Sequence, residues 1–116
     1  KQKTAYALSL GLVGSEMCIR DRVGVKGGSP TFHSKYDNGV YEYPLQGGKG
    51  RFHPTQKSLK LFMALIEKHS NEGDVVLDTF LGSGTTALAC RETGRTCFGC
   101  EVAPEYFVKM NALLDL

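Results

Sequence analysis

The sequence predicts an α/β fold in which a parallel sheet is built by a strand, a helix, a second strand and a second helix. Residues 74–78 form a short apolar run of the kind that is buried in a parallel sheet. Residues 85–93 have a helical pattern that Gly94 closes, and residues 96–100 form the next strand. This order and spacing indicate part of a truncated doubly wound, Rossmann-like sheet.

Two more helices are predicted on either side of this unit. Pro54 opens a helical stretch that runs to about His69, and the last helix starts at Pro104. Apolar residues recur every three or four positions in both stretches, so each helix is expected to bury one face. The residues on these faces are Leu59, Phe62, Leu65 and Ile66 in the first helix and Phe107, Met110, Leu113 and Leu114 in the last. Residues 23–50 are rich in glycine and aromatic residues, and we expect loops there around a short strand at residues 40–43.

The chain has 116 residues, of which 41% are apolar and 22% charged, and no apolar run is long enough to span a membrane. This composition favours one soluble globular unit at most. Two clearly patterned strands are too few for a complete doubly wound enzyme. We therefore expect the carboxy-terminal piece of a larger protein.

The first 22 residues are predicted to be an artefact. Residues 12–21 back-translate to CTC GTG GGC TCG GAG ATG TGT ATA AGA GAC, which looks like a transposase adapter from a sequencing library. Residues 1–6 likewise resemble the flow-cell primer that precedes such an adapter. Without this segment the chain loses four of its 14 basic and two of its 12 acidic residues, so the net charge of +2 disappears. Three of the four cysteines remain, which suits reduced thiols in a cytoplasm better than paired disulfides.

A glycine loop, Gly82-Ser83-Gly84, connects the first predicted strand to the helix that follows. A strand that turns directly into a helix needs positive backbone angles, and the missing side chains let a ligand lie against the main chain. A Gly-x-Gly pattern alone is equally typical of an ordinary turn. Here Glu101 ends the next strand nineteen residues after Gly82, where a carboxylate can accept both hydroxyls of a ribose. Together these features predict a nucleotide-type cofactor site.

The choice of cofactor depends on Asp78, which stands at the carboxyl end of the first strand, four residues before Gly82. Its carboxylate would repel a pyrophosphate seated at the helix amino terminus and would attract a cation. S-adenosylmethionine carries a ribose, an ammonium group and a sulfonium, and it would use Asp78 and Glu101 together. A dinucleotide remains an alternative, since residues 82–87 formally satisfy the G-x-G-x-x-G/A pattern. A P-loop is excluded, because no Gly-Lys-Ser/Thr follows.

Several blocks of the sequence, in order, resemble the DNA amino-methyltransferases, which modify adenine N6 or cytosine N4. The blocks are His53-Pro54-Thr55-Gln56-Lys57, Asn71-Glu72-Gly73-Asp74, Asp78-Thr79-Phe80-Leu81-Gly82-Ser83-Gly84-Thr85-Thr86, Phe98-Gly99-Cys100-Glu101 and Pro104-Glu105-Tyr106. Their order is that of the beta arrangement, in which the cofactor motifs lie at the carboxy terminus. The resemblance implies an S-adenosylmethionine-dependent methyltransferase fold and double-stranded DNA as the substrate. It also implies adenine N6 in preference to cytosine N4, and a cytoplasmic protein of a bacterium or phage.

The same resemblance implies which residues form the site. The cofactor pocket is lined by Asp78, Phe80, Gly82, Ser83, Gly84 and Thr85, the ribose is bound by Glu101, and the pocket is closed by His53, Thr55 and Lys57. Ser58 and Thr79 stand where the family usually has proline, and Ala103 stands where an acid is common. The last change removes a helix cap at a cost of about 1 kcal/mol, which bears on stability more than on chemistry.

No residue of the chain is assigned a catalytic role. These enzymes flip the target base out of the duplex and orient its amine with an Asp/Asn/Ser-Pro-Pro-Tyr/Phe tetrapeptide, which the sequence lacks. The nearest string, residues 29–32, lacks the second proline and lies too close to His53 for the beta order, so we expect a turn there. Residues 51–116 are thus expected to be the cofactor-binding part and residues 23–50 the loop-rich end of a target-recognition region. The chain alone is expected to be inactive.

Other residues have simpler interpretations. Cys97 and Cys100 point to opposite faces of a strand, so they cannot chelate one metal ion and are expected to be buried structural thiols. His33 and His69 are expected on the surface or in loops. Core or turn packing is favoured over base stacking for three tyrosines, Tyr36, Tyr41 and Tyr43.

Two rival functions stay open. A fragment of a nicotinamide or flavin oxidoreductase would bind a dinucleotide without needing Asp78. A non-catalytic nucleic-acid-binding module would rest on a local basic stretch, which fits contacts to DNA phosphates and a solvated surface equally well. The stretch consists of Lys49, Arg51, Lys57 and Lys60.

Overall fold

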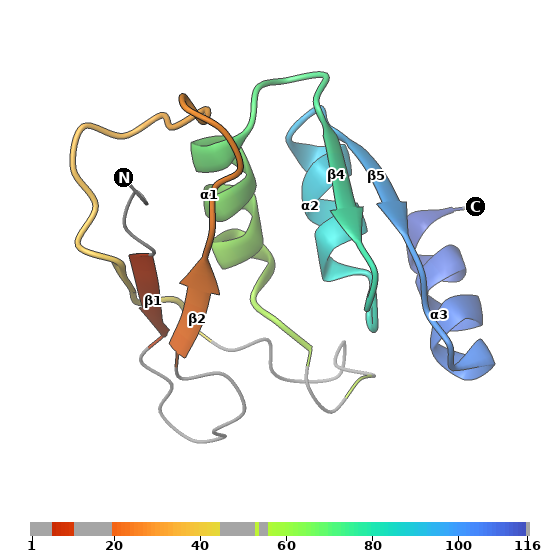
Figure 1. The fold of residues 1–116 in the computed structure, drawn as a ribbon. Coiled ribbons are helices and arrows are strands. Elements are labelled where there is room, and N and C mark those ends of the chain that lie inside the picture. Colours follow the sequence, from red (N-terminus) through yellow and green to blue (C-terminus); the bar gives the residue numbers. More distant parts are fainter. Residues whose placement is uncertain (1–5, 11–19, 45–52, 54–55, 116) are drawn as a thin grey trace.

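The computed structural model describes residues 6–10, 20–44, 53 and 56–115. The elements in these segments are, in chain order, β1 (Tyr6–Leu10), β2 (Arg20–Val23), β3 (Val40–Tyr41), α1 (Leu59–His69), β4 (Val75–Asp78), α2 (Thr85–Glu92), β5 (Thr96–Gly99) and α3 (Pro104–Leu114) (Figure 1). None of the helices in these segments has the length and apolar character needed to cross a membrane.

The strands β4 and β5 form the parallel pair that the sequence predicts. Val75 lies opposite Thr96, and Asp78 lies opposite Gly99. The helix α2 connects the two strands, and α3 follows β5. The predicted α/β class is therefore confirmed, and the carboxyl ends of both strands lie side by side at one edge of the sheet.

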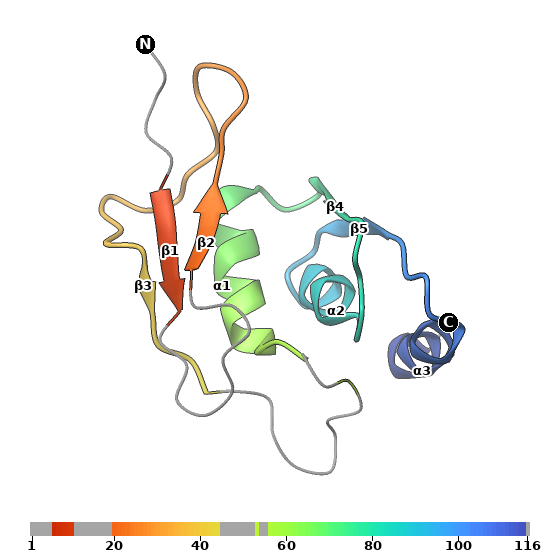
Figure 2. The same cartoon turned by 60° about the horizontal axis from the view of Figure 1, so that its bottom comes forward.

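Helices cover one face of this sheet. Ala89 and Cys90 of α2 are almost completely buried, and they form a core cluster with Ile66 of α1. The partly buried residues around this cluster come from α1, β4 and β5: Leu59, Phe62, Met63, Val76 and Cys97. Figure 2 shows α1, α2 and α3 on the same side of the β4–β5 pair. The loop between β4 and α2 is thereby held at the end of a packed layer.

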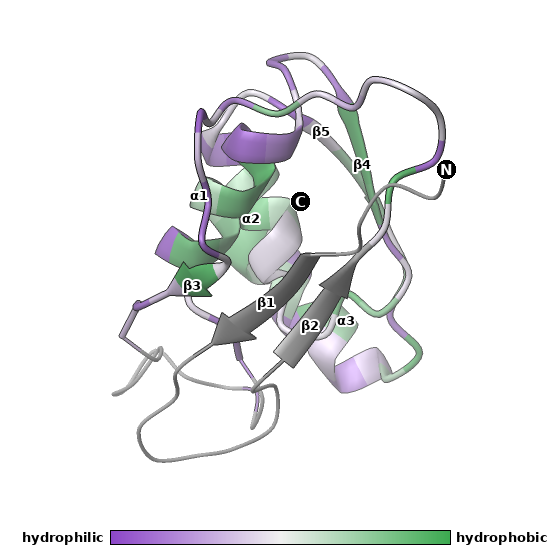
Figure 3. Ribbon diagram, turned by 60° about the vertical axis from the view of Figure 1, so that its left-hand side comes forward, coloured by the Kyte–Doolittle hydropathy of each residue, from purple (hydrophilic) through white to green (hydrophobic). Residues whose placement is uncertain are grey.

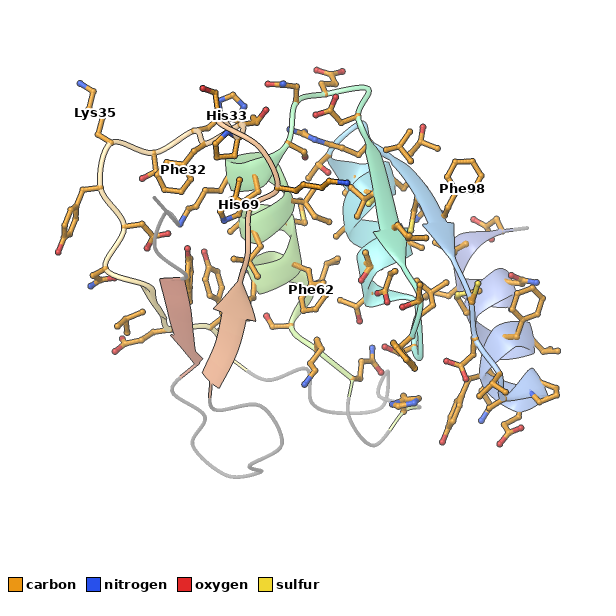
Figure 4. All side chains as sticks on the ribbon, in the orientation of Figure 1. Phe32, His33, Lys35, Phe62, His69 and Phe98 are labelled. Carbon is orange, nitrogen blue, oxygen red and sulfur yellow. The ribbon has the colours of Figure 1, made fainter. Side chains whose placement is uncertain are left out.

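The second face of the sheet is open in the described part of the chain, which corrects the prediction of a fully buried strand. Val75 and Leu77 of β4 are 64% and 68% exposed, and Phe98 of β5 is 62% exposed. Figure 3 shows β4 as an apolar strand, and Figure 4 shows Phe98 on the side of β5 away from α2. Because side chains alternate along a strand, only every second residue of β4 faces the helices.

The prediction for α3 is correct in its start at Pro104 and only partly correct in its buried face. Met110 is buried, whereas Phe107 and Leu113 are exposed. The apolar spacing fits a helical face, but only Met110 of this face is buried, and its side chain lies against Gly84. A sequence pattern shows which residues could be buried and not which of them meet a neighbour.

The helix α1 begins at Leu59, later than the predicted start at Pro54. Ser58 is buried and extended at the N-cap, and its carbonyl accepts a hydrogen bond from the Phe62 N–H at 3.2 Å. Before it, the Gln56 N–H donates to the His53 carbonyl at 3.2 Å. Ser58 occupies the N-cap position, but its side chain makes no capping hydrogen bond.

The helix α1 also packs on a second side that its pattern did not indicate. Leu61 is buried against Tyr41 of β3, and Phe62 contacts both this cluster and the one around Ile66. Tyr43 and Leu65 pack against the cluster of Tyr41 and Leu61. Core packing is therefore confirmed for Tyr41 and Tyr43, whereas Tyr36 is exposed and lies outside the core. The strand β3 is shorter than the predicted strand at residues 40–43.

A cluster of three hydrogen-bonded polar side chains joins the loop before β3 to α1. The Lys68 ammonium donates to Asp37 Oδ2 at 2.7 Å and also to the Tyr41 hydroxyl, which in turn donates to Asp37. The Lys68 and Asp37 side chains are only 18% and 16% exposed. Hydrogen bonds from Lys68 and Tyr41 lower the pKa of Asp37 from its ordinary 3.8 to about 2.

Stability at low pH is expected to depend on Asp37. Its pKa is lower in the folded chain than in the unfolded chain, so its contribution of about 2 kcal/mol is complete above about pH 5 and is lost progressively between about pH 5 and pH 1. Urea unfolding of the wild type should therefore show a steeper loss of stability in this range than unfolding of Asp37→Asn. Equal slopes for the two proteins would contradict this prediction.

The strand β1 pairs antiparallel with β2 and parallel with β3. The strand β1 and most of β2 fall within residues 1–22. The origin of that segment from an adapter stays a prediction.

Candidate cofactor-binding site

The loop of residues 79–84 joins the carboxyl end of β4 to α2. Gly82 and Gly84 have the positive φ angles that the sequence predicts, 55° and 78°. The Leu81 N–H donates to the Cys100 carbonyl at 2.8 Å, and the Gly84 N–H donates to the Leu81 carbonyl at 2.9 Å. These bonds hold the loop against the end of β5, so α2 begins beside both strand ends.

Gly84 is the N-cap of α2, and its position has no room for a side chain. A Cβ atom at this position would lie 2.4 Å from Cγ of Met110. Met110 is the buried residue of α3, so it fills the space that Gly84 leaves. Glycine is therefore required here by the packing of α3 as well as by the backbone angle.

Asp78 ends β4, and both of its carboxylate oxygens accept a hydrogen bond. Oδ1 accepts from the Phe80 N–H at 3.0 Å, and Oδ2 accepts from the Thr86 hydroxyl at 2.5 Å. The residue is half-buried and precedes the amino terminus of α2. A carboxylate in this position disfavours a bound phosphate and favours a cation.

Glu101 follows β5 and links three segments. Its Oε2 accepts from the Gly82 N–H at 2.7 Å, and its Oε1 accepts from the Ala103 N–H at 2.8 Å. The hydrogen bonds from Ala103 and Gly82, with the nearby His53, lower the pKa of Glu101 below its ordinary value. The carboxylate is therefore ionised at neutral pH and can accept hydrogen bonds from ligand hydroxyls. Because Ala103 offers no cap, α3 begins without a side-chain cap, as predicted.

An aromatic pair lies next to the glycine loop. The rings of His53 and Tyr106 are 4.2 Å apart between centroids and tilted by 56°. A Cβ atom at Gly82 would lie 3.7 Å from Nε2 of His53, which shows how close this ring is to the loop. His53, Gly82 and Glu101 thus lie next to one another, and Tyr106 joins them. Tyr106 belongs to the block Pro104-Glu105-Tyr106 of the family resemblance, but it was not predicted as a site residue.

The remaining predicted site residues differ in their surroundings. Ser83 and Thr85 are buried, and their hydroxyl oxygens lie 3.0 Å apart. Phe80 is 90% exposed, so it borders the site on an open side. Lys57 is half-buried in the segment before α1. The residues Thr55, Lys49 and Arg51 lie outside the described part of the chain.

The cysteines fit a structural role only in part. Burial raises the pKa of Cys90 and raises that of Cys97 to about 11, so both thiols stay protonated at neutral pH. Cys100 is exposed, which corrects the prediction that it is buried, because β5 ends at Gly99. Within the described segments, no three His, Cys, Asp or Glu side chains are grouped so that they could hold a metal ion.

Residues 29–32 lie beside the carboxyl end of α1. Thr31 is 3.5 Å from Asn71 between Oγ1 and Nδ2, and the Phe32 ring is 5.5 Å from that of His69. Figure 4 shows Phe32, His33 and His69 gathered there. The glycine loop contacts His53, which precedes the other end of α1, so residues 29–32 are separated from the site by the length of this helix. His33 and His69 are both exposed, which confirms their predicted surface positions.

The site as a whole places two carboxylates at the ends of adjacent parallel strands. Asp78 stands before the glycine loop and Glu101 accepts a hydrogen bond from it. The open crevice at the carboxyl ends of such strands is where α/β folds bind ligands. The arrangement suits a ligand that carries both hydroxyl groups and a cation.

Comparison with known proteins agrees with this arrangement. The model of a family described as DNA methylase matches residues 19–111, which is more than half of the chain. The type II methyltransferase M.HpaI of Haemophilus parainfluenzae is 43% identical over 63 residues. The DNA adenine methyltransferase YhdJ of Escherichia coli (strain K12) is 38% identical over 85 residues. The crystal structure of the M1.HpyAVI–SAM complex superposes with a TM-score of 0.68 at 39% sequence identity.

These matches cover most of this chain and a smaller part of each relative. The match to M.HpaI covers 54% of this chain and 20% of that protein, and the match to YhdJ covers 71% and 29%. The M1.HpyAVI structure matches over 78% of this chain and 47% of its own. The chain thus spans less than half the length of these relatives.

Proposed function

Because the chain belongs to the N6/N4 DNA methylase family, we propose that residues 51–116 form the S-adenosylmethionine-binding part of a DNA methyltransferase. The observation that carries this proposal is the pair of carboxylates, Asp78 and Glu101, at the ends of two adjacent parallel strands. The full enzyme would transfer a methyl group to an exocyclic amine of adenine or cytosine in double-stranded DNA. The relation to a DNA adenine methyltransferase supports adenine N6 as the preferred target.

The residues of the site fit this cofactor in two regions. Glu101 offers carboxylate oxygens to the two ribose hydroxyls, and the half-buried Gly82, which has no side chain, would let the adenosine lie close to the main chain. Asp78 offers a negative charge to the ammonium group of the methionine part. The cofactor would supply an activated methyl group, and the chain's own residues bind and orient it. The His53–Tyr106 pair borders the same loop and would limit the access of water.

A dinucleotide is the weaker candidate for this site. Its pyrophosphate would sit at the amino terminus of α2, in the region that the negative charge of Asp78 already occupies. Repulsion between like charges in a half-buried place costs binding energy. S-adenosylmethionine has no phosphate and does not incur this cost.

We also propose that this chain alone transfers no methyl group to DNA. The Asp/Asn/Ser-Pro-Pro-Tyr/Phe tetrapeptide does not occur in the sequence, and residues 29–32 pack at the far end of α1. Residues 23–50 would be the end of a target-recognition region, and residues 1–22 would belong to neither part. Incorporation of a labelled methyl group into duplex DNA by the chain alone would contradict the proposal that the chain alone is inactive. The sequence of the source gene upstream of Val23 would test whether residues 1–22 belong to neither part.

The role of Glu101 can be tested with a matched pair of variants. Glu101→Gln is expected to weaken binding of S-adenosylmethionine about 10-fold or more, because hydrogen bonds to a charged acceptor are stronger than those to an amide. Glu105→Gln, on the exposed first turn of α3, should stay within about twofold of the wild type. Equilibrium dialysis with labelled cofactor measures both. Equal losses in the two variants would indicate a general charge effect and would count against a ribose-binding role.

A further inference from the structure

Thr86 has a contact that the family resemblance does not assign. It lies in the first turn of α2 and is 7% exposed, and its hydroxyl donates to Asp78 Oδ2 at 2.5 Å. The acceptor belongs to β4, so this bond joins the helix to the end of the strand. It is the second of two bonds to the same carboxylate, since Oδ1 accepts from the Phe80 N–H.

The hydroxyl of a second buried threonine, at the carboxyl end of α2, donates to a different kind of acceptor. Thr93, the C-cap residue of α2, is also buried, but its hydroxyl donates to the Ala89 carbonyl at 2.7 Å, four residues before it. Bonding to a carbonyl of the preceding turn is the ordinary behaviour of threonine in helices. Thr86 instead bonds a charged side chain of another element. Its hydroxyl therefore acts on Asp78.

The two hydrogen bonds fix the direction of the Asp78 carboxylate. A carboxylate has about four acceptor positions, so both oxygens keep capacity for a further partner. A side chain that is held in one orientation before the ligand arrives loses less conformational entropy on binding. Loss of the Thr86 bond would leave Oδ2 without this partner and the carboxylate free to rotate.

We propose that Thr86 is a positioning residue that aligns Asp78 with the ammonium group of the cofactor. This inference rests on the proposed function and adds a part to it. Thr86 affects affinity through the methionine half of the ligand, whereas Glu101 affects it through the ribose. A residue that only packs in the core would affect both halves alike.

The test compares two ligands on the full 116-residue chain. S-adenosylmethionine carries the ammonium group, and 5′-methylthioadenosine has the same adenosine without the amino acid part. Thr86→Val keeps the shape of the side chain and removes the hydroxyl. It is expected to weaken binding of S-adenosylmethionine about 10-fold and to change binding of 5′-methylthioadenosine by less than about twofold. Calorimetry measures both affinities.

Two further variants complete the test. Thr86→Ser restores the hydroxyl and should bind S-adenosylmethionine within about threefold of the wild type. Thr93→Val removes the buried hydroxyl that bonds its own helix, and it should leave the ratio of the two affinities unchanged. Equal weakening of both ligands by Thr86→Val, or no weakening of either, would overturn the positioning role. Absence of S-adenosylmethionine binding by the wild type would overturn the proposed function and this inference together.

Discussion

Asp78→Asn is expected to weaken binding of S-adenosylmethionine by about 100-fold, which corresponds to about 3 kcal/mol. Asparagine keeps the size of the side chain and an oxygen that can accept from the Phe80 N–H at the end of β4. It removes the negative charge that would pair with the ligand ammonium group. The effect should be large because this carboxylate is half-buried and hydrogen-bonded on both oxygens. Isothermal calorimetry on the wild type and the variant measures the ratio.

Asp74→Asn is the matched control for this experiment. Asp74 is exposed and stands immediately before β4, at the end of the strand away from the glycine loop. The variant changes net charge by the same amount and should bind within about twofold of the wild type. Unchanged binding in Asp78→Asn would show that the charge of Asp78 does not attract the ligand. It would favour a fragment of a dinucleotide-binding oxidoreductase, for which Asp78 is not needed.

Gly84→Ala is expected to destabilise the fold by about 2 to 5 kcal/mol. Part of this cost is the left-handed backbone angle of 78°, which costs an L-residue about 1 to 2 kcal/mol. The other part is the clash with Met110, because overpacking a core contact costs about 1 to 3 kcal/mol. Urea unfolding of the variant measures the total.

Two controls separate these contributions. Gly73 has a φ angle of 85°, and a Cβ atom there meets nothing within 4 Å, so Gly73→Ala should show the backbone cost alone. In a Met110→Ala background, Gly84→Ala should cost about as much as Gly73→Ala, which a double-mutant cycle reveals. A cost for Gly84→Ala that does not depend on Met110 would show that α3 is not attached through this contact.

The segment from β4 to β5 could be predicted because its signals are local. The apolar run of β4 has the length of a strand, and Gly94 closes α2 with the positive φ angle expected of a helix end. Gly82 and Gly84 are the residues that a direct turn from strand to helix needs. Each of these choices depends on the backbone of the residue itself, so distant contacts were not needed to foresee it.

The contacts of individual side chains with other elements were not predicted. The sequence gives no direction for the Thr86 hydroxyl, and it does not place Tyr106 against His53 from another part of the chain. The exposure of Leu77 and Phe98 depends on what lies over the second face of the sheet, which periodicity alone cannot specify. The start of α1 was misplaced because proline is acceptable at the first position of a helix, whereas the helix begins only at Leu59.

Binding of S-adenosylmethionine at the ends of β4 and β5 is the property from which the other proposals follow. Calorimetric titration of the 116-residue chain with S-adenosylmethionine and, separately, with NAD tests it most directly. We predict saturable binding of S-adenosylmethionine at one site per chain and no measurable binding of NAD at the same concentrations. Binding of NAD without binding of S-adenosylmethionine would contradict the claim.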